Sequence, residues 1–128
     1  MKILIDTNIL ISALLYPTSK PAQVLLHAVN HHTLVLCDTI ITELYTVARN
    51  KFSKTIADID VFLAELSYTL VPAPATPQKL IRDPKDIPIL NAAVTENVDV
   101  IVSGDKHFLD LKLEHPKILT AAEYLEQL

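Results

Sequence analysis

The stretch Ile3-Leu4-Ile5-Asp6-Thr7-Asn8 decides the fold class of this 128-residue chain. Residues 3–5 form a continuous apolar run that is too short for a helix and rich in β-branched side chains, as expected for a strand buried on both faces. The next segment, residues 7–15, is mainly apolar, with polar breaks at Asn8 and Ser12. This four-residue spacing suits a helix, so the chain is predicted to begin with a strand, an acidic residue and a helix.

Strands and helices are predicted to alternate along the rest of the chain. Further strands are expected at residues 33–37, 68–71, 99–102 and 117–119. Helices are expected at residues 19–31, 38–50, 53–67, 86–97 and 121–127, with a short helical segment between residues 105 and 111. Asp38 is the predicted N-cap of its helix, and Ile56 and Val94 are expected on buried helix faces. Because the strands lack polar alternation and helices separate them, the sequence predicts an α/β fold with a parallel sheet covered on both faces.

Composition excludes several classes of protein. Half of the residues are hydrophobic and 20% are charged, so a compact fold is expected, with a single domain over residues 1–128. The lone glycine, Gly104, excludes glycine-rich phosphate loops, and the lone cysteine, Cys37, excludes a disulfide framework and a multi-cysteine zinc site. No apolar run approaches the roughly 18 residues that would span a membrane, and a soluble cytoplasmic protein is expected. The formal net charge of −4 provides no global basic field for nucleic acid.

Acidic residues fall where the strands of a parallel sheet end. Asp6 follows the first strand directly, and Asp105 stands three residues beyond Val102 at the end of the fourth. Glu43 lies five residues into the helix that follows the second strand. Ligands of open parallel sheets bind beyond the carboxyl ends of the strands, so these acids are predicted to share one edge. Asp86 lies near the start of a helix, and the pattern alone leaves its position relative to this edge open.

Each acid has a purely structural explanation when taken alone. Asp86 and Asp105 are suited to capping helices, and Glu43 borders an apolar stripe. Asp6 is the hardest to explain in this way, because burying its charge costs free energy unless the charge is compensated. A group of carboxylates requires a cation or raised pKa values, and oxygen ligands favour Mg²⁺ or Mn²⁺. Such ions activate water and stabilise charge on a phosphoryl group, which suits phosphodiester hydrolysis.

Four segments in order, residues 3–10, 42–44, 82–90 and 102–109, resemble the PIN domain family. More narrowly, the chain resembles the small single-domain PIN proteins of the VapC-like toxin branch. The resemblance covers essentially the whole chain. It implies a three-layer α/β/α sandwich around a mainly parallel sheet of four to five strands, and Mg²⁺- or Mn²⁺-dependent ribonuclease activity in a type II toxin–antitoxin system. An RNA substrate, a cognate antitoxin and a homodimer are the partners it implies.

The resemblance also assigns site residues. The four acidic positions of the family correspond to Asp6, Glu43, Asp86 and Asp105 in this sequence, as catalytic and metal-binding residues. Asp83 is a substitute for Asp86 in a shifted register. Asn8 and Ser103 match polar positions that support the acids through hydrogen bonds. The resulting hypothesis is that one or two metal ions activate a water for in-line attack on an RNA phosphodiester.

Basic residues flank the acids in sequence. The residues expected to contact RNA are Arg82, Lys85, Lys106 and His107. A second basic cluster, Arg49, Lys51 and Lys54, fits either RNA contacts or solvated helix ends. His27, His31 and His32 are expected to be surface residues without a metal role. Gly104 is expected at a turn that uses its backbone freedom.

Particular residues argue against two other functions. A receiver-type phosphoacceptor domain needs an acidic pair after the first strand and an Asp after the third, and this chain has neither. A haloacid-dehalogenase-like phosphatase needs D-x-D, where this chain has Asp6-Thr7-Asn8. The remaining alternative is a PIN-fold binding or assembly module whose nuclease activity is absent or suppressed by a partner. The apolar helices at residues 9–15 and 56–66 would then supply a dimer surface or an antitoxin groove.

Overall fold

The sheet has five parallel strands and fits the predicted fold class. The computed structural model describes residues 1–73, 87–111 and 113–127. The strands lie in the order β3-β2-β1-β4-β5, with every pair parallel. Their bounds are Lys2–Ile5 (β1), Thr33–Cys37 (β2), Thr69–Val71 (β3), Val100–Val102 (β4) and Lys117–Leu119 (β5). Leu4 of the central strand pairs with Val35 on one side and Ile101 on the other, so the order of strands reverses at β1.

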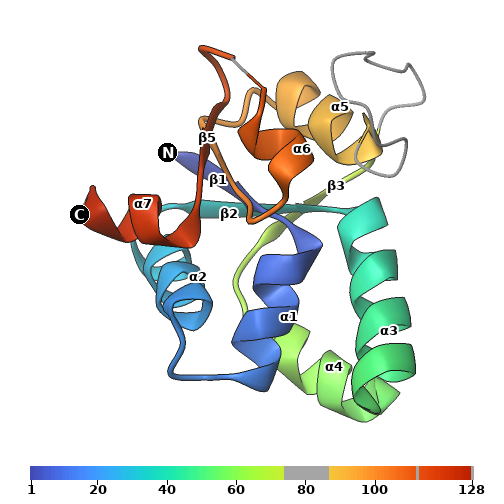
Figure 1. Cartoon of the computed structure of the whole chain (residues 1–128). Helices are drawn as coiled ribbons and strands as arrows, with labels where there is room; N and C mark the ends of the chain where they lie inside the picture. Colours follow the sequence, from blue (N-terminus) through green and yellow to red (C-terminus); the bar gives the residue numbers. More distant parts are fainter. Residues whose placement is uncertain (74–86, 112, 128) are drawn as a thin grey trace.

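Helices cover both faces of the sheet, which completes a three-layer α/β/α sandwich (Figure 1). The helices are Thr7–Leu15 (α1), Lys20–His31 (α2), Asp38–Phe52 (α3), Ile56–Ala64 (α4), Ile87–Thr95 (α5), Lys106–Leu109 (α6) and Ala121–Glu126 (α7). α1 to α4 and α7 lie on one face, and α5 and α6 lie on the other. This distribution follows from the right-handed connections between parallel strands. From β1 to β3 the chain adds strands on one side of β1, and from β4 to β5 it adds them on the other side, so the connecting helices lie on opposite faces of the sheet.

The core forms where the apolar strands meet the apolar sides of the helices. Ile3, Leu4 and Ile5 are fully buried, as a strand covered on both faces requires. α3 contributes Leu44 to the core, and Phe108 of α6 is the largest fully buried side chain. Burying each of these side chains stabilises the fold by about 1.5–3 kcal/mol. The central strand is thereby held rigidly, together with the residues at its carboxyl end.

Three local predictions are wrong. Asp38 is the first residue of α3 and not its N-cap, because β2 runs directly into the helix and Cys37 takes the cap position. The helix predicted over residues 53–67 is shorter, since Ser53 is left-handed (φ 54°) and a capping box of Thr55 and Asp58 starts α4 at Ile56. Ile56 is consequently half exposed instead of buried.

Two further expectations fail outside these helices. Val94, on α5, is 42% exposed and does not belong to the buried face. Gly104 has no positive φ, and a Cβ at its position would meet no atom within 4 Å, so neither conformation nor space requires glycine there. Among the described residues no single helix is long and apolar enough to cross a membrane; α1 and α2 meet that length and composition only as a pair bent by 107°.

Candidate functional site

Asp6 lies at the carboxyl end of β1, where the strand order reverses. Its backbone N–H donates to the carbonyl of Val102 (3.1 Å), which extends the pairing of β1 with β4. Its carboxylate caps α1, because one oxygen accepts from the N–H of Ile9 (3.1 Å). The side chain is only 4% exposed. The sequence thus places a carboxyl group inside the protein, at the position that parallel sheets use for ligands.

Ser103 connects Asp6 with Asp105. The fully buried hydroxyl of Ser103 donates a short hydrogen bond to the second carboxylate oxygen of Asp6. The same hydroxyl oxygen accepts from the backbone N–H of Asp105 (2.9 Å). Ser103 therefore fixes the orientation of one acid and the position of the next, because its single side chain bridges the ends of β1 and β4.

Thr7 holds Glu43 in place. Its hydroxyl donates to the carboxylate of Glu43 with a distance of 2.9 Å, and thereby links the first residue of α1 with the second turn of α3. Thr7 is only 5% exposed, and Glu43 is half-buried. Sequence reasoning did not single out Thr7, although it stands inside the Asp6-Thr7-Asn8 motif. The sequence signal that could have identified Thr7 was its hydroxyl group, which stands between the two predicted site residues Asp6 and Asn8.

Electrostatic interactions connect the three described acids, Asp6, Glu43 and Asp105, in one site. Burial raises the pKa of Asp6 from its ordinary value of 3.8 to about 6. The hydrogen bonds from Ser103 and Ile9 oppose this rise, and the negative charges of Asp105 and Glu43 add to it. Asp6 thus lies within electrostatic reach of both other acids. The edge of the sheet carries a concentration of negative charge around one buried carboxyl group.

Asp105 and its neighbours form the outer part of the site. Asp105 is the N-cap of α6, and its carboxylate accepts from the backbone N–H of His107 (2.8 Å). Lys106 and His107 are exposed beside it. Asn8 is exposed on α1, and within the described part of the chain no hydrogen bond joins it to the acids.

Comparison with known proteins gives the family. A family model described as "PIN domain" matches residues 2–107. The chain belongs to the PIN domain family. No curated protein sequence matches it. The VapBC2 structure from Rickettsia felis, bound to a DNA fragment from its promoter, contains a chain that is 18% identical with a TM-score of 0.70. The DNA-bound VapBC structure from Salmonella typhimurium contains one that is 14% identical with a TM-score of 0.68.

Both matches extend over nearly complete chains: each covers 94% of this PIN domain and 98% of the matched chain. At these identities the matches establish the fold. The family model confirms the predicted family, and the structural matches confirm the predicted α/β/α architecture. They also show that this arrangement of strands and helices occurs in proteins crystallised as VapBC complexes.

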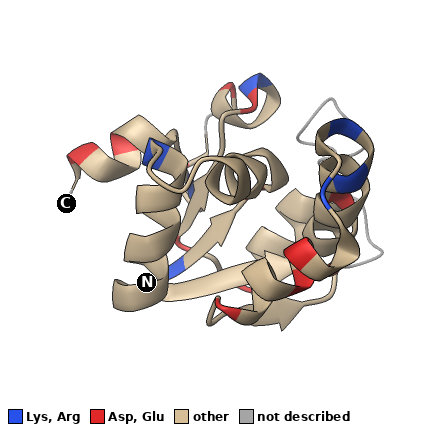
Figure 2. Ribbon diagram, turned by 90° about the horizontal axis from the view of Figure 1, so that it is seen from below, with Lys and Arg blue, Asp and Glu red and all other residues tan. Residues whose placement is uncertain are grey.

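The other residues predicted for the site or for RNA contacts either lie outside the described residues or lie far from the acids. Asp83, Asp86, Arg82 and Lys85 lie outside the residues that the structure describes. Arg49 and Lys51 are exposed in the last turn of α3, and Lys54 follows at its end. Figure 2 shows basic residues close together on that side of the molecule, where α3 ends and α4 begins. This basic cluster lies at the opposite end of α3 from Glu43, and cations there also favour the helix dipole.

The donor set of the PIN domain site fits a hard divalent cation. Asp6, Glu43 and Asp105 offer only carboxylate oxygens, the ligands that Mg²⁺ and Mn²⁺ prefer. Asp6 is buried and its pKa is raised, so its charge is poorly compensated by the protein. Within residues 1–73, 87–111 and 113–127, no group of three or more His, Cys, Asp or Glu side chains is arranged to hold a metal ion. The three acids therefore have suitable chemistry without forming a closed metal cage.

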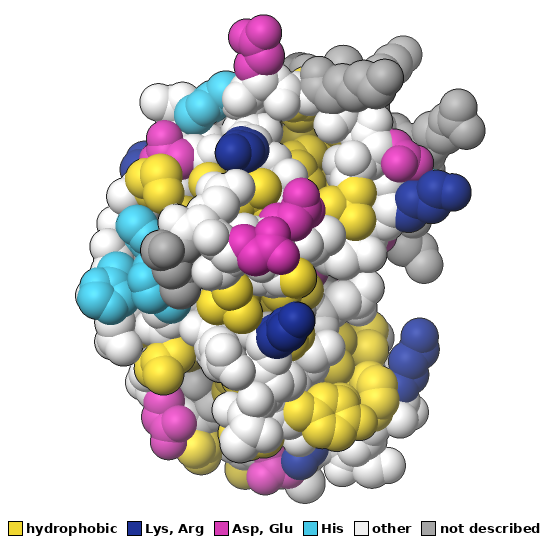
Figure 3. Space-filling view, turned by 60° about the vertical axis from the view of Figure 1, so that its left-hand side comes forward, with side chains coloured by type: hydrophobic (Ala, Val, Ile, Leu, Met, Phe, Trp, Pro, Cys, Tyr) yellow, Lys and Arg dark blue, Asp and Glu magenta, His cyan; other side chains and the backbone are white. Residues whose placement is uncertain are grey.

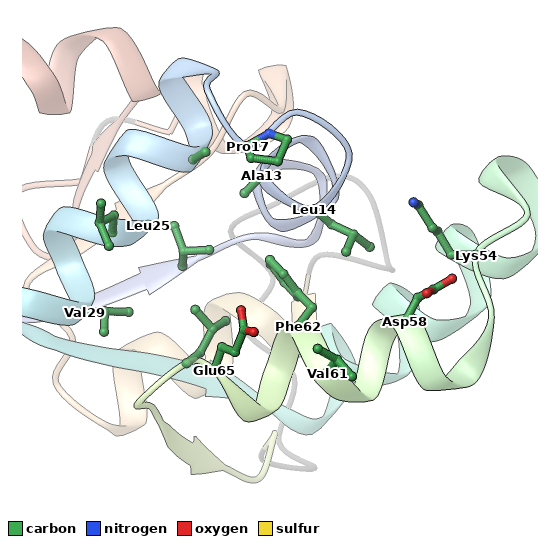
Figure 4. A pocket seen from close by; sticks show the side chains of 13 residues that line it. Ala13, Leu14, Pro17, Leu25, Val29, Lys54, Asp58, Val61, Phe62 and Glu65 are labelled. Atoms are coloured by element: carbon green, nitrogen blue, oxygen red, sulfur yellow. The ribbon is translucent and has the colours of Figure 1, made fainter.

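An apolar groove runs between α1, α2 and α4, away from the acids (Figure 4). Its volume is about 490 Å³. Figure 4 shows Leu14, Leu25 and Phe62 directed into it from the three helices, with charged side chains at its border. Two apolar residues of its lining are largely exposed, Leu26 at 63% and Val61 at 59%. The groove thus presents apolar surface that the described residues do not cover.

Proposed function

We propose that this PIN domain is a metal-dependent ribonuclease that hydrolyses RNA phosphodiester bonds and acts as the toxin of a type II toxin–antitoxin system. The observation that carries the proposal is the buried carboxyl group of Asp6, held by Ser103 and Ile9 within reach of two more acids. A charged group in this position destabilises the fold, and a function that needs the charge accounts for its presence. The likeness to chains of VapBC structures supports the assignment to toxin–antitoxin systems.

Asp6, Glu43 and Asp105 would hold Mg²⁺ or Mn²⁺, together with Asp86 or, in a shifted register, Asp83. When bound, such a cation supplies charge stabilisation for the phosphoryl group and lowers the pKa of a coordinated water. The protein's own contribution is positioning. Ser103 and the N–H of Ile9 fix both oxygens of Asp6, and Thr7 fixes Glu43.

Proton transfer also suits the site. A carboxylate of the site, or a hydroxide on the metal, would accept the proton of the attacking water. The exposed Lys106 and His107 stand beside Asp105, where they would contact the RNA backbone. Affinity for RNA then comes from these local cations and from the metal site, since the chain carries a formal net charge of −4.

The proposal is tested with purified protein and a labelled single-stranded RNA, with Mg²⁺ or Mn²⁺ as the added ion. Wild-type protein is expected to cleave the RNA, EDTA is expected to stop cleavage, and Asp6→Asn is expected to abolish it. Glu126→Gln, which removes an exposed acid on α7, is the matched control and should retain full activity. Metal-dependent cleavage that survives in Asp6→Asn would refute the assignment of the site.

We propose that the protein binds a cognate antitoxin, and that an apolar segment of the antitoxin lies in the groove between α1, α2 and α4. The largely exposed Leu26 and Val61, together with the likeness to chains from VapBC complexes, support this placement. The protein is further proposed to be a cytoplasmic homodimer. Light scattering that gives a monomer over a wide concentration range would contradict the dimer.

The antitoxin is sought as the product of a short reading frame immediately upstream that encodes a small DNA-binding protein. Val61→Glu should prevent a complex with that protein and leave RNA cleavage intact. Ile56→Glu, on the same helix but outside the groove lining, should bind normally. Equal binding by both variants would contradict the location. Lack of cleavage by the wild-type protein, combined with formation of the complex, would instead favour the alternative of a PIN-fold binding module.

A further inference from the structure

Three histidines form a cluster at the opposite edge of the sheet from the acids. His27 and His31 are one turn apart on α2, with ring centroids separated by 4.5 Å. The ring of His32, directly before β2, lies 5.5 Å from that of His27. Figure 3 shows His side chains gathered in one patch on the surface of the molecule. Because β2 begins at Thr33 and the acids follow the carboxyl ends of the strands, this patch is separate from the proposed nuclease site.

Tyr124 orients His27. Its hydroxyl lies 2.7 Å from the Nδ1 of His27, and the two rings meet edge-on with centroids 5.5 Å apart. Tyr124 is 4% exposed on α7, so its position is fixed by packing. This hydrogen bond occupies one nitrogen of His27 and leaves Nε2 for another partner. A second group that fixes the other ring nitrogen is the usual support of a metal-binding histidine.

We propose that His27 and His31 bind one borderline divalent transition-metal ion, of the class of Ni²⁺ or Zn²⁺. Metal–nitrogen distances of about 2.0–2.1 Å require ligand nitrogens about 3.3 Å apart for the tetrahedral angles of Zn²⁺ and about 2.9 Å apart for the right angles of Ni²⁺. The two rings are already neighbours, and the exposed His31 can rotate its side chain to meet either distance. Water completes the coordination sphere, because the described residues offer no group of three such ligands arranged for a metal.

The histidine pair prefers a different class of metal ion from the class that the acids prefer. Imidazole nitrogen suits Ni²⁺, Cu²⁺ and Zn²⁺, whereas Mg²⁺ prefers carboxylate oxygen. Burial and the neighbouring His31 lower the pKa of His27, and the neutral ring is the form that binds metal. The bound ion would brace the end of α2 and, through the hydrogen bond to Tyr124, its contact with α7. This inference does not depend on ribonuclease activity.

Isothermal titration with Ni²⁺ tests the site, with excess Mg²⁺ present to compete for carboxylate ligands. Wild-type protein is expected to bind one Ni²⁺ ion, and His31→Ala to lose this binding. His115→Ala, which removes a histidine that contacts Asn97, is the control for nonspecific imidazole binding and should behave as wild type. Circular dichroism verifies that each variant is folded.

Tyr124→Phe tests the orienting role of the hydroxyl without removing the packed ring. It is expected to weaken Ni²⁺ binding by about 10–100-fold, the usual effect of removing such a support. Nitrogen-15 NMR of the histidine rings should show coordination at Nε2 of His27 in the wild type. Identical Ni²⁺ isotherms for wild type and His31→Ala would overturn the site, and an unchanged affinity in Tyr124→Phe would overturn the role of Tyr124.

Discussion

Replacing Asp6 by Asn is expected to stabilise the protein at neutral pH. The pKa of Asp6 rises from 3.8 to about 6 on folding, mainly because the carboxyl group is buried. An acid with a raised pKa favours the folded state when it is protonated and disfavours it when it is ionised. The cost is therefore absent below pH 3.8, grows through the window from 3.8 to about 6, and is complete above it. The difference between these two pKa values corresponds to about 3 kcal/mol.

Asparagine removes this cost and keeps the cap of α1, but it changes the contact with Ser103. Its side-chain carbonyl can accept from the N–H of Ile9, as the carboxylate oxygen does. Its amide group can donate to the hydroxyl oxygen of Ser103, but this reverses the direction of the hydrogen bond and leaves the buried hydroxyl proton of Ser103 without its acceptor. Asparagine is also as good an N-cap as aspartate, and α1 should keep its first turn. The expected gain in the free energy of unfolding at pH 7.5 is the removed cost of about 3 kcal/mol, reduced by about 1–3 kcal/mol for the unpaired hydroxyl of Ser103, and the gain should be about 1.5 kcal/mol smaller at pH 5.

Urea unfolding of both proteins in EDTA, at pH 5 and pH 7.5, measures this difference. Glu126→Gln, which neutralises an exposed carboxylate, serves as the control and should change the free energy of unfolding by less than about 0.5 kcal/mol. A variant that is less stable than wild type at pH 7.5 would refute the reasoning. So would a gain that is equal at the two pH values, because the linkage requires it to grow with pH.

Three further substitutions probe the same framework. Ser103→Ala should cost about 1–3 kcal/mol in urea unfolding and raise the pKa of Asp6 further, observable by carbon-13 NMR of its carboxyl group, because a buried carboxyl group loses its donor. Thr7→Val keeps the shape of Thr7 and removes its bond to Glu43; we expect a loss of about 0.5–1.5 kcal/mol in the same assay and a larger relative loss of RNA cleavage. Phe108→Ala should cost about 3–5 kcal/mol, visible as a lower urea midpoint with an unchanged slope.

The architecture could be predicted because its signals are local and consistent. The three central strands contain short continuous apolar runs, and the longer helices have apolar residues at helical spacing. Parallel pairing follows from the alternation of strands and helices. Errors arose where neighbouring segments compete for one residue. Asp38 has the chemistry of an N-cap, yet the strand before it continues into the helix and moves the cap to Cys37. Ser53 ends one helix in a left-handed conformation that its sequence does not announce.

The candidate site was predictable only to the level of which acids share an edge. Positions after strands place Asp6, Glu43 and Asp105 together, and the family resemblance added Asp86, which lies outside the described residues. The hydrogen bonds that connect the three described acids were not predictable, because Ser103 acts across two strands that are distant in sequence. Thr7 was missed for a related reason: its partner lies 36 residues away, and only the packing of α1 against α3 brings them together.

The fold and the proposed function make different demands on the side chain of residue 6. Capping α1 needs a hydrogen-bond acceptor, and asparagine or serine would supply one without a charge. Accepting the hydroxyl of Ser103 needs no charge either. The ionised carboxylate accepts both donors at once, but its burial still costs about 3 kcal/mol at neutral pH when these hydrogen bonds are included. A cost of this size at the reversal point of a parallel sheet argues that the charge itself is what the site uses, and a divalent cation beside Asp6 is the partner that would offset it.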